Sequence, residues 1–361
     1  MKLCPKHSNS NLSPTSIRKA DMNFRSIAQL SDQLISWSKE LPHDIDAVVG
    51  IPRSGLLAAS ILALYRNVPF TDVDGLLEGR CLSTGRRENA LNAMGDGAAL
   101  RFLDEPRRIL VLDDSIRTGT ALSEVRSQIE FADLPHKIIY GAVYATPGAA
   151  SIPDVYCEIL PDPRMFEWNV LHHPKLEEAC LDMDGVLCAD PRREENDDGK
   201  RYRRFLLEAR PLHCPRARIG YIVTNRLEKY RPETKAWLAK QGIEYGDLIM
   251  MDYPDAETRR RMGTCSEHKA RVYRNVKASI FIESDLKQAI EISKLARKEV
   301  ICVDTMQLVR PDAKPAGRFR HYDIEDVQEP SMSRRLARRV VPKSIRYRIH
   351  SARRTLSSVE D

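Results

Sequence analysis

The sequence predicts an α/β protein with two doubly wound parallel-sheet domains, and three observations lead to this prediction. Short apolar runs, such as Ile109 to Leu112, alternate with longer segments that have helical spacing. Apolar runs of this kind are typical of strands buried on both faces, as in a parallel sheet. Several of the runs end in acidic or hydroxyl residues, as strands do at a functional sheet edge. The chain of 361 residues is long enough for two such domains.

The composition is that of a globular protein, with 42% hydrophobic and 30% charged residues. No apolar run approaches the length that spans a bilayer, and the N-terminus lacks the apolar core of a secretory signal. We therefore expect a cytoplasmic protein. The eight cysteines form no CxxC pair and are expected to be reduced thiols.

The net charge of +6 is unevenly placed, because residues 313–361 are expected to form a basic C-terminal tail. Its segment Ser333 to Arg354 is rich in Lys and Arg, lacks acids and carries spaced apolar residues. This pattern suits peripheral contact with the anionic inner face of a membrane, and a solvated tail is the alternative. No nucleic-acid motif or set of base-stacking aromatics accompanies it, so no nucleic-acid partner is expected.

The first candidate site follows the apolar run Ile109 to Leu112. Asp113 and Asp114 come directly after it, then a loop of hydroxyl residues with Gly119, then helical spacing from Ala121 to Ala132. Loop amides and a helix N-terminus bind phosphate well, and a glycine lets the backbone come close. Two adjacent carboxylates suit the vicinal hydroxyls of a sugar, or a magnesium ion bound to them. The stretch therefore predicts a site for a sugar phosphate, with simple capping of the helix by the Asp pair as the alternative.

A similar arrangement lies earlier in the chain. A short apolar run from Asp46 to Ile51 leads into Pro52-Arg53-Ser54-Gly55 and then into the apolar helical segment Leu56 to Tyr65. Because the carboxyl ends of parallel strands share one edge of a sheet, we expect the two loops to face each other. Between them lies Leu77 to Gly97, which is rich in Gly, Arg, Asn and Ser and has no regular pattern.

The two loops resemble the phosphate-binding loops of type I phosphoribosyltransferases, which transfer ribose 5-phosphate from phosphoribosyl pyrophosphate (PRPP). The resemblance implies that Asp113 and Asp114 hold the ribose hydroxyls at the catalytic centre, and that magnesium accompanies the pyrophosphate. In that family the region corresponding to Leu77 to Gly97 closes over the pyrophosphate, and an ordinary exposed loop is the alternative here. The substrate-binding residues implied are Arg53, Ser54, Gly55, Arg86, Arg87, Ser115, Ile116, Arg117, Thr118, Gly119 and Thr120.

The second half of the chain carries another carboxylate pair. Residues 151–175 are punctuated by prolines, so we expect a linker between a first domain, 1–150, and a second, 176–312. Asp182 and Asp184 then follow a short apolar run, and their spacing places them on the same side of an extended chain. Such a pair can coordinate one cation, while one carboxylate attacks phosphorus and the other handles protons.

This stretch, DMDGVL, resembles the first motif of the haloacid dehalogenase (HAD) superfamily, whose members are mostly phosphatases. The resemblance implies Asp182 as nucleophile and Asp184 as acid and base. The segment Cys188 to Arg218 is too short for a full cap, so we expect a minimal cap and an open site. The residues implied to bind the phosphoryl group are Thr224, Asn225 and Lys269. The residues implied to bind Mg²⁺ are Asp182, Asp184, Glu283 and Asp285, with Glu283 favoured over Asp285.

Both halves together resemble the ribofuranosyltransferase modules of bacterial capsule and O-antigen polysaccharide synthesis. The first half is expected to move ribose 5-phosphate from PRPP to a glycan acceptor, carried on a lipid, with release of pyrophosphate. The second half is expected to remove the 5-phosphate and leave a β-ribofuranoside. The alternatives are a nucleotide-salvage phosphoribosyltransferase with 5'-nucleotidase activity and a PRPP-sensing regulator. A homodimer is a further expectation from the family, although no pattern in the sequence marks an interface.

Overall fold

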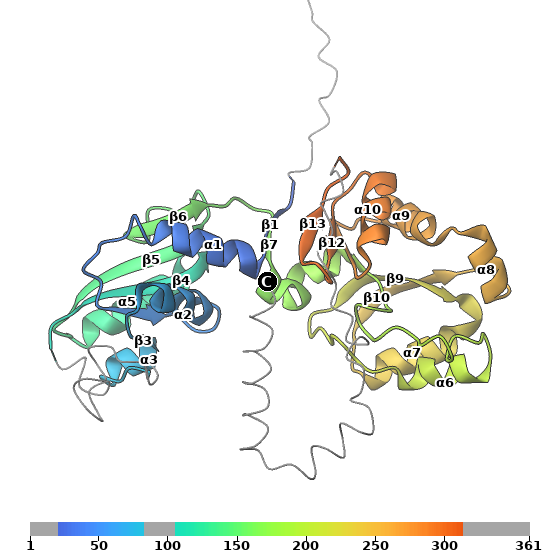
Figure 1. Ribbon diagram of the computed structural model, residues 1–361, viewed down its shortest axis with the longest axis horizontal. Coiled ribbons are helices and arrows are strands. Elements are labelled where there is room, and N and C mark those ends of the chain that lie inside the picture. The colour runs from blue at the N-terminus through green and yellow to red at the C-terminus, as the bar shows by residue number, and fades with distance from the viewer. Residues whose placement is uncertain (1–20, 83–104, 313–361) are drawn as a thin grey trace, which may run out of the picture. The chain divides into compact units, whose positions relative to one another are not determined.

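The computed structural model describes residues 21–82 and 105–312, which form two parallel sheets with helices on both faces of each (Figure 1). The prediction of an α/β protein with parallel sheets is therefore confirmed.

The first sheet has five parallel strands in the order β3-β2-β4-β5-β6. Its strands are β2 (Ala47–Gly50), β3 (Phe70–Asp72), β4 (Arg108–Ile116), β5 (Lys137–Ala145) and β6 (Val155–Ile159). Its helices are α1 (Ile27–Trp37), α2 (Gly55–Arg66), α3 (Val73–Leu77) and α5 (Thr120–Phe131). Val48 and Leu110 pack with α1 and α2, whereas Val49 and Val111 pack with α3 and α5 on the opposite face. This alternation explains why the strands read as unbroken apolar runs.

The second sheet has six strands in the order β10-β9-β8-β11-β12-β13, and only β13 runs antiparallel. Its strands are β8 (Ala179–Leu181), β9 (Ile219–Leu227), β10 (Tyr245–Met251), β11 (Ile280–Glu283), β12 (Val300–Cys302) and β13 (Gln307–Val309). Its helices are α6 (Lys200–Glu208), α7 (Arg231–Lys240), α8 (Ala256–Met262), α9 (Cys265–Asn275) and α10 (Leu286–Ala296). Side chains of α6 and α7 join the core on one face, and those of α9 and α10 join the core on the other.

Each sheet has a point where the direction of winding reverses. In the first sheet the chain runs outward from β2 to β3, then returns to β4 and continues to β5 and β6. In the second it runs from β8 to β9 and β10, then returns to β11 on the other side of β8. Ligands of open α/β sheets bind outside the carboxyl ends of the strands at such points. The candidate sites are expected between β2 and β4 and between β8 and β11.

The expected linker, 151–175, is not irregular, and this prediction is wrong. Residues Val155–Ile159 form β6, the edge strand of the first sheet, paired with β5. Three further elements follow: β7 (Arg164–Phe166), which pairs with β1 (Asn23–Arg25), and the short 3₁₀ helices η3 (Glu167–His172) and η4 (Pro174–Glu178). The prolines misled the prediction because Pro153, Pro161 and Pro163 lie between these elements and Pro174 is the first residue of η4, where the missing N–H costs nothing.

The short segment between β8 and β9 contains α6 as its single α-helix among the described residues. In the part of the chain that the structure describes, no helix is both long and apolar enough to cross a membrane. The basic tail, 313–361, lies outside the described residues.

Candidate functional site

The two predicted phosphate loops meet at the switch point of the first sheet. The Ser54 hydroxyl, just before α2, donates to Asp114 Oδ1 over 2.6 Å. Gly55 allows this approach, because a Cβ atom there would lie 2.8 Å from the Leu112 carbonyl oxygen and 3.2 Å from Asp113 Cα. The peptide bond between Pro52 and Arg53 is cis. The sequence prediction that the loops face each other is therefore realised by direct contact.

Asp113 and Asp114 do not follow the strand, as the sequence suggested, but lie within it, because β4 continues to Ile116. The strand β2 pairs with β4 only as far as Leu112, whereas β5 stays paired up to Ile116. The two carboxylates thus lie where one neighbouring strand has left the sheet, and both are buried. Burial and the neighbouring Asp114 raise the pKa of Asp113 to about 8. Asp113 therefore holds its proton more tightly than an ordinary carboxyl group.

The loop after β4 presents polar groups at the start of α5. Gly119 is the residue before the helix and has a φ of 76°, which suits glycine. Thr118 and Thr120 are exposed and share a hydrogen bond of 2.9 Å between their hydroxyls. Ile116, in contrast, is buried in the core, so only its backbone is available to a ligand.

Of the remaining residues of the first predicted site, those that the structure describes are more exposed than the carboxylate pair. Ser115 is half-buried at the end of β4, and Arg53 is exposed. Arg117 is exposed and pairs with Asp162 over 2.9 Å. Arg86 and Arg87 lie outside the described residues.

Two residues of the first site were missed because they lie in the expected linker. Trp168 Nε1 donates to Asp114 Oδ2 over 2.8 Å. Arg164 is buried, its Nη1 has no hydrogen-bond partner among the described residues, and its Nε lies 3.8 Å from Asp162. Burial lowers the pKa of Arg164, and the charges of Asp162, Asp114 and Asp113 oppose this effect. No local pattern distinguishes these two residues in the sequence.

The second site is built around a buried lysine. Asp182 follows β8, Glu283 ends β11, and Lys269 reaches both from α9. Lys269 Nζ lies 2.7 Å from Asp182 Oδ2 and 2.7 Å from Glu283 Oε2. Burial would lower the pKa of Lys269, but the two carboxylates raise it overall. The pKa of Asp182 is raised to about 8, chiefly by burial and also by the charges of Glu283 and Asp184. Lys269 acts in the opposite direction, but it is shared between two carboxylates.

Asp184, the predicted acid and base, is held by an arginine that the sequence did not single out. Arg226 lies in β9, is 1% exposed and forms an ion pair with Asp184 through Nε and Nη2. Arg226 Nη2 also donates to Cys188 Sγ over 3.1 Å. Burial would lower the pKa of Arg226, and the Asp184 charge raises it overall.

The predicted phosphoryl-binding residues lie on β9 and α9. Thr224 is fully buried, and its hydroxyl accepts a hydrogen bond from the Arg226 amide over 3.2 Å. Asn225 is half-buried; its Nδ2 donates to Gln288, and its Oδ1 has no partner among the described side chains and backbone. Thr224 and Asn225 lie within β9, which continues to Leu227.

Of the four predicted magnesium ligands, Asp182, Asp184 and Asp285 line one cavity, and Glu283 shares Lys269 with Asp182. Asp184 is paired with Arg226. Asp285 is exposed and accepts a hydrogen bond from the Gln288 amide at the start of α10. Across residues 21–82 and 105–312, no group of three or more His, Cys, Asp or Glu side chains is placed to hold a metal ion. Because Lys269 and Arg226 are paired with these carboxylates, no chemical step is assigned to a metal at this site.

A cavity of about 350 Å³ opens over the second site, and Asp182, Asp184, Asn225 and Lys269 are among the residues that line it. Asp190 lies in the same cavity, where burial and the charges of Asp184 and Asp182 raise its pKa to about 6. The lining of this cavity is polar, with carboxylates, the Asn225 amide and the cations of Lys269 and Arg259.

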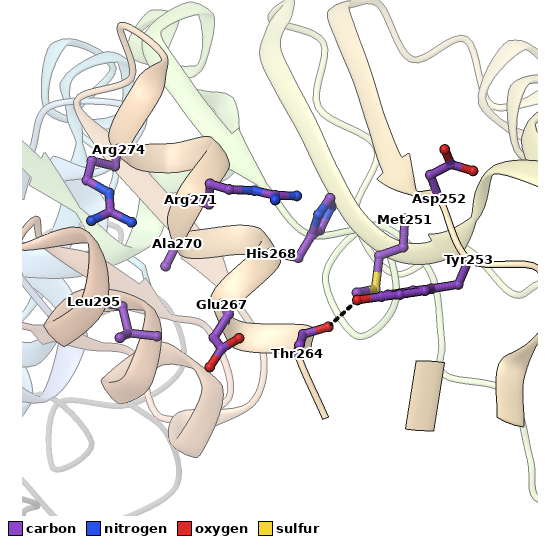
Figure 2. A pocket seen from close by; sticks show the side chains of 10 residues that line it. All are labelled: Met251, Asp252, Tyr253, Thr264, Glu267, His268, Ala270, Arg271, Arg274 and Leu295. Atoms are coloured by element: carbon purple, nitrogen blue, oxygen red, sulfur yellow. Dashed lines mark hydrogen bonds between the residues drawn. The ribbon is translucent and has the colours of Figure 1, made fainter. Parts of the chain in front are cut away.

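Another cavity, of about 530 Å³, lies against different residues of α9. Figure 2 shows His268 and Arg271 projecting from α9 and a hydrogen bond between the hydroxyls of Tyr253 and Thr264, which measures 3.0 Å. Burial lowers the pKa of His268 to about 4, and its Nε2 has no hydrogen-bond partner in the described part of the chain. This cavity contains none of the predicted site residues.

Comparison with solved structures finds similarity over part of the chain. A purine phosphoribosyltransferase from Pyrococcus horikoshii is 18% identical; the match covers 41% of this chain and 94% of that one, with a TM-score of 0.29. A xanthine-guanine-hypoxanthine phosphoribosyltransferase from Helicobacter pylori is 15% identical over 41% and 93% of the two chains, with a TM-score of 0.30. A hypothetical protein from Neisseria gonorrhoeae with bound ppGpp is 12% identical over 42% and 91%, with a TM-score of 0.30. No protein-family model and no curated protein matches the chain.

Proposed function

We propose that this chain transfers ribose 5-phosphate from PRPP to a glycan and then removes the 5-phosphate. The transferase domain comprises the first sheet and its helices, and the phosphatase domain comprises the second. The product is a β-ribofuranoside in a bacterial surface polysaccharide.

The observation that carries the transferase assignment is the 2.6 Å hydrogen bond from Ser54 to Asp114. It joins the loop after β2 to the carboxylate pair on β4, at the point of the sheet where ligands bind. Around it lie the groups that a sugar phosphate needs: carboxylates for hydroxyls, and the start of α5 with two exposed threonines for a phosphate. These features together support a site for ribose 5-phosphate.

In the proposed transfer, a hydroxyl oxygen of the glycan forms a bond to C1 of the ribose, and the bond from C1 to the pyrophosphate oxygen breaks. The proton of the hydroxyl group passes to the departing pyrophosphate or to water. Asp113 and Asp114 hold the ribose hydroxyls, and the loop from Ser115 to Thr120 holds the 5-phosphate. Magnesium enters as part of the PRPP substrate, bound to its pyrophosphate. The contribution of the protein is mainly positioning of the two reactants, which can supply a large part of the rate enhancement.

In the proposed hydrolysis, Asp182 attacks the phosphorus atom, and the bond from phosphorus to the ribose 5-oxygen breaks as that oxygen takes a proton from Asp184. Water then gives a proton to Asp184 and attacks phosphorus, which breaks the bond to Asp182 and releases phosphate. The buried contact between Lys269 and Asp182 supports this role, because the ammonium group lies within 2.7 Å of the attacking carboxylate. Arg226 fixes the orientation of Asp184 through its ion pair. The open cavity over Asp182 leaves room for a phosphorylated sugar.

Several partners belong to this proposal. The acceptor is a glycan carried on a lipid, and the basic tail binds the inner face of the membrane that contains it. A homodimer is the proposed assembly, by analogy with phosphoribosyltransferases.

The test is to incubate the full chain with PRPP, magnesium and a panel of glycans and free purine and pyrimidine bases. Release of pyrophosphate and phosphate is measured, and products are identified by mass spectrometry. Asp182→Asn should release pyrophosphate and accumulate the phosphorylated glycan. Asp114→Asn is the matched variant at the other site and should release neither.

Turnover with a base but not with a glycan would replace this proposal with nucleotide salvage. Binding of PRPP without turnover of any acceptor would favour a PRPP-sensing regulator. Dephosphorylated glycan from the Asp182→Asn variant would show that the second sheet does not carry the phosphatase.

A further inference from the structure

Trp168 reaches the carboxylate pair of the first site from outside both phosphate loops. It lies in the 3₁₀ helix η3, and its indole N–H donates to Asp114 Oδ2 over 2.8 Å. Ser54 donates to the other oxygen of the same carboxylate. Both Asp114 oxygens therefore accept a hydrogen bond from fixed donors, and the plane of the carboxylate cannot rotate without breaking one of them.

A cluster of aromatic rings fixes Trp168 in place. Its ring centroid lies 4.8 Å from that of Phe166 and 6.4 Å from that of Tyr144, at interplanar angles of 18° and 23°. The centroids of Phe166 and Tyr144 are themselves only 5.3 Å apart. The three centroids form a triangle, so the two rings cannot lie on opposite faces of the indole. Phe166 and Tyr144 belong to the core of the first sheet, and they hold the indole while it stays half-buried beside Asp114.

The Asp114 carboxylate keeps free acceptor positions for a ligand. An ionised carboxylate has about four acceptor positions. Ser54 and Trp168 occupy two of them on Asp114. The remaining positions are fixed in direction, and the buried carboxyl group of Asp113 lies beside them in the chain. Acceptors with a fixed direction suit a pair of neighbouring hydroxyl groups.

The same segment also carries Arg164. This arginine is buried, its Nη1 has no partner among the described residues, and its Nε lies 3.8 Å from Asp162. The charges of Asp162, Asp114 and Asp113 raise its pKa against the effect of burial. Segment Arg164–Trp168 therefore combines a buried cation with the N–H donor that contacts Asp114.

We propose that Trp168 is a positioning residue that directs Asp114 at the vicinal diol of ribose, and that it thereby makes the first site select ribose 5-phosphate over 2-deoxyribose 5-phosphate. The inference rests on the proposed function of the first site as a ribose 5-phosphate site. It adds the residue that sets the selectivity for the sugar.

The experiment measures binding of ribose 5-phosphate and of 2-deoxyribose 5-phosphate to the full chain by isothermal titration calorimetry. Trp168→Phe retains an aromatic ring for the cluster and removes the N–H donor together with part of the bicyclic ring. We expect about tenfold weaker binding of ribose 5-phosphate and unchanged binding of the deoxy sugar, because the lost bond involves a charged group. In an Asp114→Ala background the same substitution should have no further effect.

Trp237→Phe is the matched control, because the Trp237 indole N–H also donates over 2.8 Å, to the Ala209 carbonyl oxygen in the core of the second sheet. It should leave the affinities for both sugars unchanged. The inference is overturned if Trp168→Phe keeps the wild-type selectivity, or if it weakens both sugars equally. A wild-type chain that binds neither sugar phosphate overturns the proposed transferase function, and this inference with it.

Discussion

Three charged side chains are buried together in the second sheet, where Lys269 neutralises only one of the carboxylates of Asp182 and Glu283. Removal of one partner from a buried ion pair leaves an uncompensated charge. Lys269→Met should therefore lower the free energy of unfolding by about 3–5 kcal/mol. Urea unfolding followed by circular dichroism measures this change, and phosphate release should be lost with it.

Lys235→Met is the control for this variant, because Lys235 is exposed on α7. It should change stability little. Addition of Glu283→Gln to Lys269→Met should recover part of the lost stability, because one buried negative charge is removed. Wild-type stability of Lys269→Met alone would contradict the description of this cluster.

Titration of the Asp113 carboxyl group should make the free energy of unfolding depend on pH. Its pKa is raised to about 8 in the folded protein by burial and by Asp114, so the folded chain binds a proton that the unfolded chain has released. The stabilisation from this proton is complete below the unfolded pKa and is lost as the pH rises through the folded pKa. The free energy of unfolding should thus fall between about pH 4 and about pH 8, by at most about 1.4 kcal/mol per pH unit from this group.

Urea unfolding at several pH values within that window tests this expectation. Asp113→Asn cannot titrate at this position, so its stability should depend less on pH than that of the wild type. An equally steep loss of stability in both proteins would show that other groups cause it.

At the scale of secondary-structure elements, the start of α2 depends on Gly55. A Cβ atom there would lie 2.8 Å from the Leu112 carbonyl oxygen, and neither backbone segment can move freely. Gly55→Ala should push α2 away from β4, lower the free energy of unfolding by about 1–3 kcal/mol and move Ser54 away from Asp114. Calorimetry should show weaker binding of PRPP as a result.

Gly148→Ala is the matched control for Gly55→Ala. A Cβ atom at Gly148 meets no atom within 4 Å, and this glycine has no positive φ that would strain an alanine. Its stability and PRPP affinity should match those of the wild type. If Gly55→Ala behaves in the same way, the close packing of α2 on β4 does not determine the geometry of the site.

At the scale of the whole molecule, both sheets place a carboxylate pair beside the strand where the winding reverses. Asp113 and Asp114 lie on β4, next to β2, and Asp182 follows β8, next to β11. The repeated arrangement is consistent with the proposal of two separate reactions, each with its own carboxylates.

The sequence by itself determined the α/β class and most carboxylates of the candidate sites, because buried strands and the polar residues at their ends are consecutive in the chain. The pattern identified Asp113, Asp114, Asp182 and Asp184 for this reason. It also identified Lys269, through its resemblance to a motif. These patterns are local in the sequence, so they can be recognised without knowledge of the fold.

Only the tertiary structure decided which groups surround those carboxylates. Trp168 reaches Asp114 across 54 positions of the chain, and Arg226 reaches Asp184 across 42. The structure also places part of the expected linker in strand β6, and it shows Lys269 and Arg226 paired with three of the expected metal ligands. The physical reason is that the direction of a side chain depends on the packing of elements distant in sequence, which periodicity and composition do not encode.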